Sequence, residues 1–299
     1  MVPVEHPRPH RTLLLYLAAV LLGAALVSPA IWHVVHHQWP GSSMSQQPFH
    51  RYVNRCLLGL ALAGLWPLLR SLGADSWQAI GAHQPRTRWG DWLRGLAFGW
   101  GSLGLATIVV VGGGGRQWNP SSDGRLWVSH VMGALGTALV VSLLEELLFR
   151  GAIFSALRRT GSFAWAAGLS SSLYAFVHFL QRPPNPEVIT ATSGFMVLAQ
   201  MLGGFLEWRL LVPGWITLLL AGWILSLARE RSGHLAFSVG MHAGWIFWLK
   251  SYGFATTAAA AGTASTLWGS GRLYDGWVAT GMLVVAGGTL HLGLRPRAS

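Results

Sequence analysis

Apolar runs of about 20 residues recur along this 299-residue chain and constrain its fold more than any other feature. A run of this length crosses the hydrocarbon core of a bilayer as a helix, because a helix satisfies its own backbone hydrogen bonds there. The runs lie near 12–35, 52–72, 93–113, 127–149, 162–180, 213–228, 235–250 and 276–294. Charged residues form only 10% of the chain, against roughly 25% in soluble domains. The sequence therefore predicts an all-α polytopic membrane protein with about eight transmembrane helices, in which residues 1–299 form a single integral membrane domain.

Three other segments are expected to connect or flank these helices. The apolar piece 195–206 is too short to span, so we expect it to be interfacial or re-entrant. The four glycines at 112–115 lack the Lys and Ser/Thr of a phosphate-binding loop, which favours a flexible helix end. The small-residue tract 252–271 is interpreted as a loop.

The formal net charge of +11 does not indicate a nucleic-acid partner, because basic residues that bind phosphate cluster on one face or in one domain. Here they alternate between loops, and the pairs Arg158 with Arg159 and Arg229 with Arg231 follow helices predicted to end on the same side. By the positive-inside rule that side is cytoplasmic. We therefore expect an integral protein of a bacterial inner membrane, with both termini in the cytoplasm and the lipid bilayer as its surroundings. Cys56 is the single cysteine, which rules out an internal disulfide and a cysteine-based metal cluster.

Two adjacent acids and an arginine interrupt the apolar stretch LVVSLLEELLFRGAIF at 139–154. A carboxylate at the middle of a bilayer costs about 2.5–3.5 kcal/mol on insertion scales, so such residues usually face a protein interior and have a function. Glu146 and Arg150 have the i,i+4 spacing of a helical ion pair. A purely structural ion pair would account for these two residues but would leave Glu145 without a role.

Two histidines lie within other predicted spans. His178 lies eighteen residues after Thr160, and at 1.5 Å per residue it should reach a depth similar to that of Glu145, about 22–27 Å from the intervening turn. His242 is flanked by Gly240 and Gly244 at a spacing that allows close approach of a neighbouring helix. A lone histidine is more often a satisfied core residue than a catalyst. Two histidines and a glutamate pair in so apolar a chain favour a functional site.

The stretches EELLFR (145–150), YAFVH (174–178) and HAGWI (242–246) resemble the three motifs EExxxR, FxxxH and HxxxN of the CAAX-protease and bacteriocin-processing (CPBP) family, which includes the Rce1-like endopeptidases. The resemblance covers a core of about 125–250. Tyr174 stands where the family has Phe, and Ile246 where it has Asn.

The resemblance implies an intramembrane endopeptidase that cleaves a membrane-associated peptide or protein. It implies that Glu145 acts with His178 as the general base on a water molecule, and that His242 stabilises the oxyanion. Glu146 and Arg150 would support these groups. Because Ile246 cannot donate a hydrogen bond, we expect Tyr174 to be a candidate second donor.

Other interpretations stay open. The HExxH motif of metalloproteases is absent, and a serine–histidine dyad built on GLSS (168–171) would leave both glutamates unexplained. A divalent metal such as zinc, held by Glu145, His178 and His242, is an alternative to a water activated by glutamate alone. From a different functional class, the chain could be a proton-coupled transporter, or a non-catalytic immunity or scaffold protein.

Overall fold

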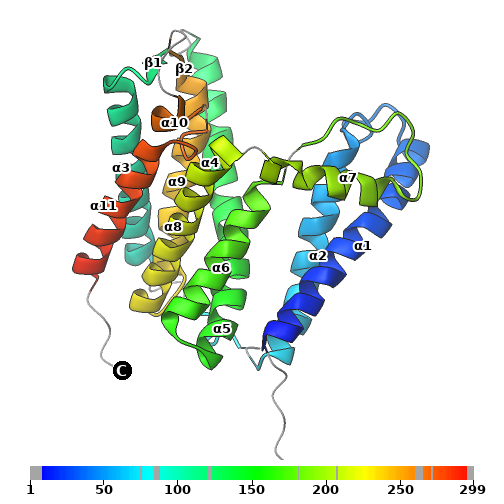
Figure 1. Ribbon diagram of the computed structural model, residues 1–299, viewed down its shortest axis with the longest axis horizontal. Helices are drawn as coiled ribbons and strands as arrows, with labels where there is room; N and C mark the ends of the chain where they lie inside the picture. Colours follow the sequence, from blue (N-terminus) through cyan, green and yellow to red (C-terminus); the bar gives the residue numbers. More distant parts are fainter. Residues whose placement is uncertain are drawn as a thin grey trace, which may run out of the picture. The chain divides into compact units, whose positions relative to one another are not determined.

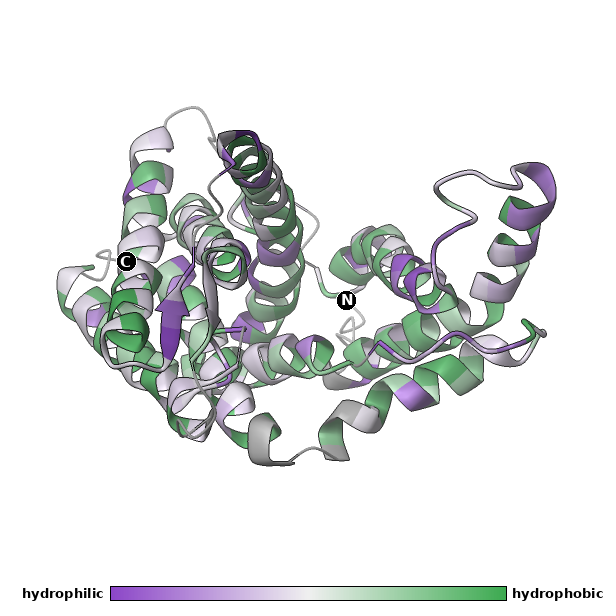
Figure 2. Cartoon of the chain, turned by 90° about the horizontal axis from the view of Figure 1, so that it is seen from above, coloured by the Kyte–Doolittle hydropathy of each residue, from purple (hydrophilic) through white to green (hydrophobic). Residues whose placement is uncertain are grey.

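The fold is nearly all helical. The computed structural model describes residues 9–73, 76–83, 88–119, 123–180, 182–206, 208–259, 265–270 and 272–294. Within these ranges the β-structure is one antiparallel pair of three-residue strands, β1 (Arg116–Trp118) and β2 (Thr256–Ala258). The helices are largely hydrophobic along their length, and hydrophilic residues gather in strands and connecting segments (Figure 2). The predicted class, an all-α polytopic membrane protein, is confirmed.

The chain divides into two compact units, one formed by Met1–Asp75 with His178–Glu207 and the other by Ser76–Val177 with Trp208–Ser299. Whether the two units act as the single domain expected from the sequence stays a prediction.

The first unit is built on two long helices and a short apolar segment. Its elements are α1 (Pro9–Gln38), α2 (Phe49–Ser71), α7 (Ser193–Met201) and the 3₁₀-helix η3 (Leu202–Leu206) (Figure 1). The Asn185 side chain accepts a hydrogen bond of 2.7 Å from the Phe49 N–H and so satisfies an N–H group at the start of α2. The nine residues of α7 are too few to cross a bilayer, in agreement with the expectation for 195–206.

The second unit contains the candidate site. Its helices are α3 (Trp89–Gly112), α4 (Gly124–Glu146), the π-helix η2 (Leu147–Phe154), α5 (Ser155–Thr160), α6 (Phe163–His178), α8 (Trp208–Ser232), α9 (Ala236–Ala255), α10 (Ser265–Trp268) and α11 (Trp277–Gly293). The last residue of α6, His178, falls in the range of the first unit.

The helices coincide with the eight predicted runs, although not all have the length of a span. Among the described residues, five stretches are long and apolar enough to cross a membrane: Arg11–Gln38, Phe49–Ser71, Trp89–Gly112, Gly124–Thr160 and Leu211–Ser232. The other three predicted spans correspond to α6, α9 and α11, of which α6 and α11 have 16 and 17 residues. The number of eight spans therefore stays a prediction.

Helix α9 is the interior helix of the second unit. It packs against α3, α4 and α8 (Figure 1), and its residues from Phe237 to Trp245 are all buried without interruption. A helix that is apolar and buried on every side lies in the core of its domain. His242, in the middle of this stretch, is therefore held in the core of the second unit.

The glycine run at 112–115 ends a helix, as predicted, and also has a packing role. A Cβ atom added at Gly113 or Gly115 would lie 2.2 or 2.4 Å from the ring of Trp268. Trp268 belongs to α10, and β2 also lies within the tract 252–271 that the sequence predicted to be a loop. That prediction was wrong at these positions, because three-residue strands and one-turn helices are stabilised by contacts distant in sequence and leave no periodic pattern.

The arginine pairs lie at one end of the second unit, as the alternation of basic residues predicted. Arg158 forms an ion pair with Glu230, which lies between Arg229 and Arg231 (N···O 2.8 Å). At the same end, the Leu235 N–H donates to the Gly81 carbonyl. Residues 1–8 and 295–299 are outside the described ranges, so the cytoplasmic location of both termini stays a prediction.

Candidate active site

Glu145 and Glu146 are the last two residues of α4, where the helix changes its hydrogen-bonding pattern. The π-helix η2 follows directly, and Phe149 to Phe154 are all buried. A π-helical turn is wider than an α-helical turn and is often found at functional sites. The stretch read from sequence as one α-helix therefore contains a local widening next to both acids.

The expected ion pair between Glu146 and Arg150 is present, and neither side chain has any solvent exposure. Arg150 Nη1 lies 3.0 Å from Glu146 Oε1. Arg150 Nη2 also donates to the Gly222 carbonyl on α8 at 3.2 Å, and its Cζ atom lies 4.6 Å from the centre of the Tyr174 ring on α6. Buried charges require several such partners to offset their desolvation. Arg150 therefore ties η2 to both α6 and α8.

His242 joins both glutamates. Its Nδ1 lies 3.0 Å from Glu146 Oε1, the same oxygen that faces Arg150. Its Nε2 lies 3.6 Å from Glu145 Oε2 and 3.3 Å from the Tyr174 hydroxyl. When Nδ1 donates to Glu146, a neutral imidazole accepts at Nε2 from the Tyr174 O–H, whereas a protonated one donates from Nε2. We call Glu145, Glu146, Arg150, Tyr174 and His242 the acid–histidine cluster.

The two glutamates have different surroundings. The Glu146 side chain is fully buried, whereas that of Glu145 is 25% exposed. With His242 protonated, the charges of Glu145, Glu146, Arg150 and His242 sum to zero. Glu146 is therefore suited to hold His242 in place, and Glu145 is suited to meet an incoming molecule.

Glycines fix the position of His242 relative to α3. A Cβ atom added at Gly240 would lie 2.1 Å from the Trp92 carbonyl oxygen, and one added at Gly244 would lie 2.5 Å from the Trp100 nitrogen. On α3, an added Cβ at Gly99 would lie 2.0 Å from the Met241 carbonyl oxygen. The close helix approach expected around His242 is confirmed.

A small cavity adjoins the cluster. Its volume is about 30 Å³, and Tyr174 and His242 form part of its wall together with Thr217, Trp245 and Tyr274. A cavity of this size with polar groups in its wall has room for about one water molecule. Tyr274 was missed in the sequence, because it lies in a loop about 100 residues after Tyr174 and belongs to none of the three motifs.

The side chain at the Asn position of the HxxxN motif is that of Ile246, so a second hydrogen-bond donor has to come from another side chain. Ile246 is half-buried, and the preceding Trp245 donates its indole N–H to the Ser102 hydroxyl at 2.9 Å. That indole donor is therefore already in use. Tyr174, whose hydroxyl contacts His242, is the better candidate donor.

His178 is the sequence-predicted residue that the cluster does not include. It ends α6 and falls in the range of the first unit, so its expected pairing with Glu145 stays a prediction. The proposed zinc ligands Glu145, His178 and His242 are likewise divided between the two unit ranges. Among the described residues, no group of three or more His, Cys, Asp or Glu side chains has an arrangement that could hold a metal ion.

Fold and cluster together define a polytopic membrane protein with a buried glutamate–arginine–histidine site. Residues 127–248 match the family model described as type II CAAX prenyl endopeptidase Rce1-like. The match runs from α4 to α9 and contains Glu145, Glu146, Arg150, Tyr174, His178 and His242. This segment of the chain is therefore similar to an Rce1-like protease family, and the predicted resemblance to the CPBP family is confirmed. Comparisons with curated proteins and with solved structures found no match.

Proposed function

We propose that the protein is an intramembrane endopeptidase that cleaves a membrane-bound peptide with a water molecule activated by Glu145. The observation that carries this proposal is the placement of His242, which contacts buried Glu146 through one ring nitrogen and the partly exposed Glu145 through the other. An adjoining cavity of about 30 Å³ supports a role for bound water.

In the proposed reaction, Glu145 removes a proton from water as its oxygen attacks the scissile carbonyl carbon. The resulting oxyanion accepts hydrogen bonds from His242 Nε2–H and from the Tyr174 hydroxyl, donors worth a few kcal/mol each in such sites. Glu145 then gives its proton to the amide nitrogen as the C–N bond breaks. His178 assists Glu145 as a second base, as the family motif implies, and no step uses a metal ion.

The substrate is a peptide held at the membrane. The family description points to a prenylated C-terminal CAAX peptide as the first substrate to test. The same peptide without its prenyl group tests whether the lipid is required.

The test is cleavage of these peptides by the purified protein in lipid nanodiscs, followed by mass spectrometry. We expect Glu145→Gln and His178→Ala each to reduce turnover by at least about 10²-fold, as general-base losses do, without loss of folding. Because they act as one unit, the double variant should be no worse than either single variant. Glu230→Gln, which removes a partly exposed acid outside the cluster, should retain wild-type turnover.

Retention of most activity by Glu145→Gln would contradict the mechanism. If neither peptide is cleaved, membrane peptides from cells expressing wild type and Glu145→Gln can be compared for species that accumulate uncut. Loss of proton flux in Glu145→Gln, with no cleavage by wild type in any assay, would instead identify a transporter, and no effect of Glu145→Gln in either assay would indicate a scaffold.

A further inference from the structure

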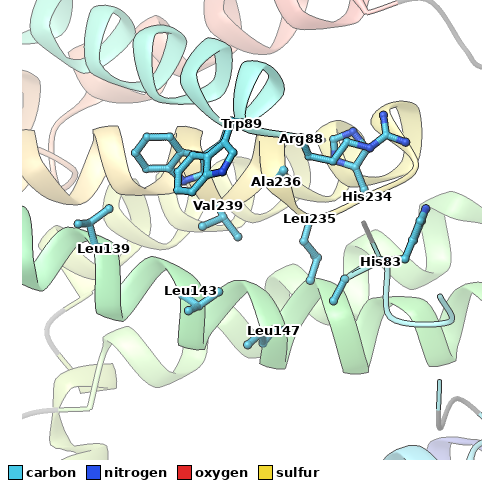
Figure 3. A pocket seen from close by; sticks show the side chains of 13 residues that line it. His83, Arg88, Trp89, Leu139, Leu143, Leu147, His234, Leu235, Ala236 and Val239 are labelled. Carbon is cyan, nitrogen blue, oxygen red and sulfur yellow. The ribbon is translucent and has the colours of Figure 1, made fainter. Parts of the chain in front are cut away.

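A groove of about 460 Å³ lies in the second unit, and its lining includes no member of the acid–histidine cluster. It is lined by residues 81–83, the first turn of α3, one face of α4 that continues to the start of η2, and the segment from His234 into α9 (Figure 3). This volume is within the range of sites that bind small molecules, about 300–1,000 Å³. Nothing in the proposed peptidase mechanism uses it.

Most of the groove has apolar walls that are open to the surroundings. Leu139 and Leu143 of α4 and Leu147, the first residue of η2, line it at four-residue spacing, which places them in one row about 12 Å long. Trp89 and Val239 line the opposite side (Figure 3). Leu139, Leu143 and Trp89 are 47%, 48% and 63% exposed, so an apolar chain can enter the groove from the bilayer.

One end of the groove is polar and basic. Figure 3 shows His83, Arg88 and His234 together at the end away from Leu139. Asp91 lies at this end, and its carboxylate is 3.0 Å from His234 Nε2, 3.7 Å from Arg88 Nη1 and 3.4 Å from Arg94 Nη1. One carboxylate shared by two guanidinium groups and an imidazole leaves this end with a surplus of positive charge.

In the described part of this end, two side-chain nitrogen atoms lack a hydrogen-bond partner. Among the residues that the structure describes, His83 Nδ1 and Arg88 Nε are buried and have no hydrogen-bond partner. Arg88 is also the N-cap of α3 and makes no side-chain capping bond, so the positive end of that helix adds to the local field. Buried polar groups without partners are rare in native proteins and call for a missing partner. An anion at this position would supply it.

We propose that this groove binds one anionic phospholipid, with an acyl chain along the row of leucines and the phosphate at His83 and Arg88. The apolar volume open to the bilayer favours a lipid over a soluble anion. The polar end also lies at the arginine-bearing end of the unit, since Gly81, which lines the groove, lies against the Arg229 guanidinium. That end is the predicted cytoplasmic side, where anionic lipid headgroups and basic residues attract each other. The inference does not depend on the proposed peptidase activity.

The test is lipid binding to the purified full-length chain in detergent, followed by native mass spectrometry. Phosphatidylglycerol and phosphatidylcholine with the same acyl chains are titrated in parallel. We expect one phosphatidylglycerol molecule per chain, bound at least about 5-fold more tightly than phosphatidylcholine, because one basic residue near a headgroup contributes about this factor.

Two matched pairs of variants locate the site. Arg88→Gln should weaken phosphatidylglycerol binding about 5-fold and remove the preference, whereas Arg94→Gln should keep it, because Arg94 is 78% exposed and does not line the groove. Leu143→Trp should weaken both lipids by filling the groove, whereas Leu135→Trp, on the same helix outside the lining, should not. If Leu143→Trp does not fold by circular dichroism, the arginine pair decides alone.

Three results would overturn the proposal. Equal affinity for the two lipids would mean that the groove is merely apolar. Equal effects of Arg88→Gln and Arg94→Gln would mean that the preference for the anionic lipid comes from general positive charge and not from Arg88 in the groove. Displacement of the lipid by millimolar inorganic phosphate would mean that the site binds a soluble anion.

Discussion

At the scale of single residues, the two neighbouring glutamates differ in burial and in contacts, so that Glu146 can hold His242 and Glu145 can act on a substrate. Glu146 shares its Oε1 atom between Arg150 and His242, and all three side chains are buried or nearly so. Glu145 keeps partial exposure beside His242 Nε2. Glu146 is held by two charged or polar partners, whereas Glu145 is accessible to water and to a substrate. A general base requires such access together with fixed neighbouring groups.

Removing the buried arginine should affect stability first. Arg150→Ala leaves Glu146 without its guanidinium in a site with no solvent exposure, so we expect a loss of about 3–5 kcal/mol in the free energy of unfolding. Arg158→Ala, which breaks the partly exposed pair with Glu230, should cost less than about 1 kcal/mol. Unfolding of both variants in mixed micelles, followed by circular dichroism, measures the difference. Equal losses would show that the buried pair contributes no more than a surface pair.

The Tyr174 hydroxyl is expected to take part in turnover. Tyr174→Phe keeps the ring that lies over Arg150 and removes the O–H that contacts His242. We expect kcat to fall about 10–100-fold with little change in KM, as for a donor that acts in the transition state. Wild-type kcat in this variant would dismiss the role. A gain in kcat from Ile246→Asn would then indicate that the proposed peptidase works with one oxyanion donor fewer than the CPBP motifs supply.

At the scale of elements, the contact between α3 and α9 determines where His242 lies. Gly95 and Gly99 of α3 face Phe237 and Met241 of α9 with no room for a side chain. Within a bilayer there is no hydrophobic driving force between helices. They associate through van der Waals contacts, and small residues allow the two backbones to approach closely. The two-glycine pattern around His242 therefore positions the site as well as stabilising the unit.

This contact can be tested with a matched pair of substitutions on one helix. Gly99→Ala places a methyl group 2.0 Å from the Met241 carbonyl oxygen, whereas Gly101→Ala has no atom within 4 Å of the added Cβ. We expect Gly99→Ala to destabilise the protein by about 1–3 kcal/mol and to lower cleavage, because α9 must shift. Gly101→Ala should be neutral or slightly stabilising, because alanine favours a helix more than glycine does. Thermal unfolding and peptide cleavage report the two effects, and similar behaviour of the variants would mean that α3 and α9 are not held by this contact.

At the scale of the whole molecule, the second unit has a basic end and, at the other end of α3 and α9, a pair of short strands. The turn after α5 and the end of α8 meet through the Arg158–Glu230 pair, whereas α3 and α9 lead directly toward the paired strands β1 and β2. These strands pair just beyond the C-terminal ends of both helices, with Gln117 beside Thr257. The basic end and the strand pair should therefore face opposite sides of the membrane.

Cysteine labelling in intact cells tests this orientation. In a Cys56→Ser background, Thr160→Cys should be protected from a membrane-impermeant thiol reagent and Gln117→Cys should react. Both positions are exposed in the structure, so protection reports sidedness rather than burial. The reverse pattern would place the basic end outside and contradict the positive-inside assignment.

The sequence by itself determined the features that depend on local pattern. Hydropathy over about 20 residues located the long helices, because bilayer thickness sets that length. The four-residue spacing of Glu146 and Arg150 predicted their ion pair, and the glycines around His242 predicted a close helix contact. Each of these follows from helix geometry, in which a residue meets partners at known spacings along its own chain.

The tertiary structure decided which distant groups meet. His242 and Glu146 are 96 residues apart in the chain, and their contact depends on the rotation and depth of two packed helices. The π-helical turn, the pairing of 116–118 with 256–258 and the basic end of the groove have the same origin. From sequence, His178 was paired with Glu145 by its depth and by the family motif, and depth does not specify which face of a helix a side chain occupies. The packing of helices determines which face of each helix is turned toward the site, and that packing consists of contacts between residues far apart in the sequence.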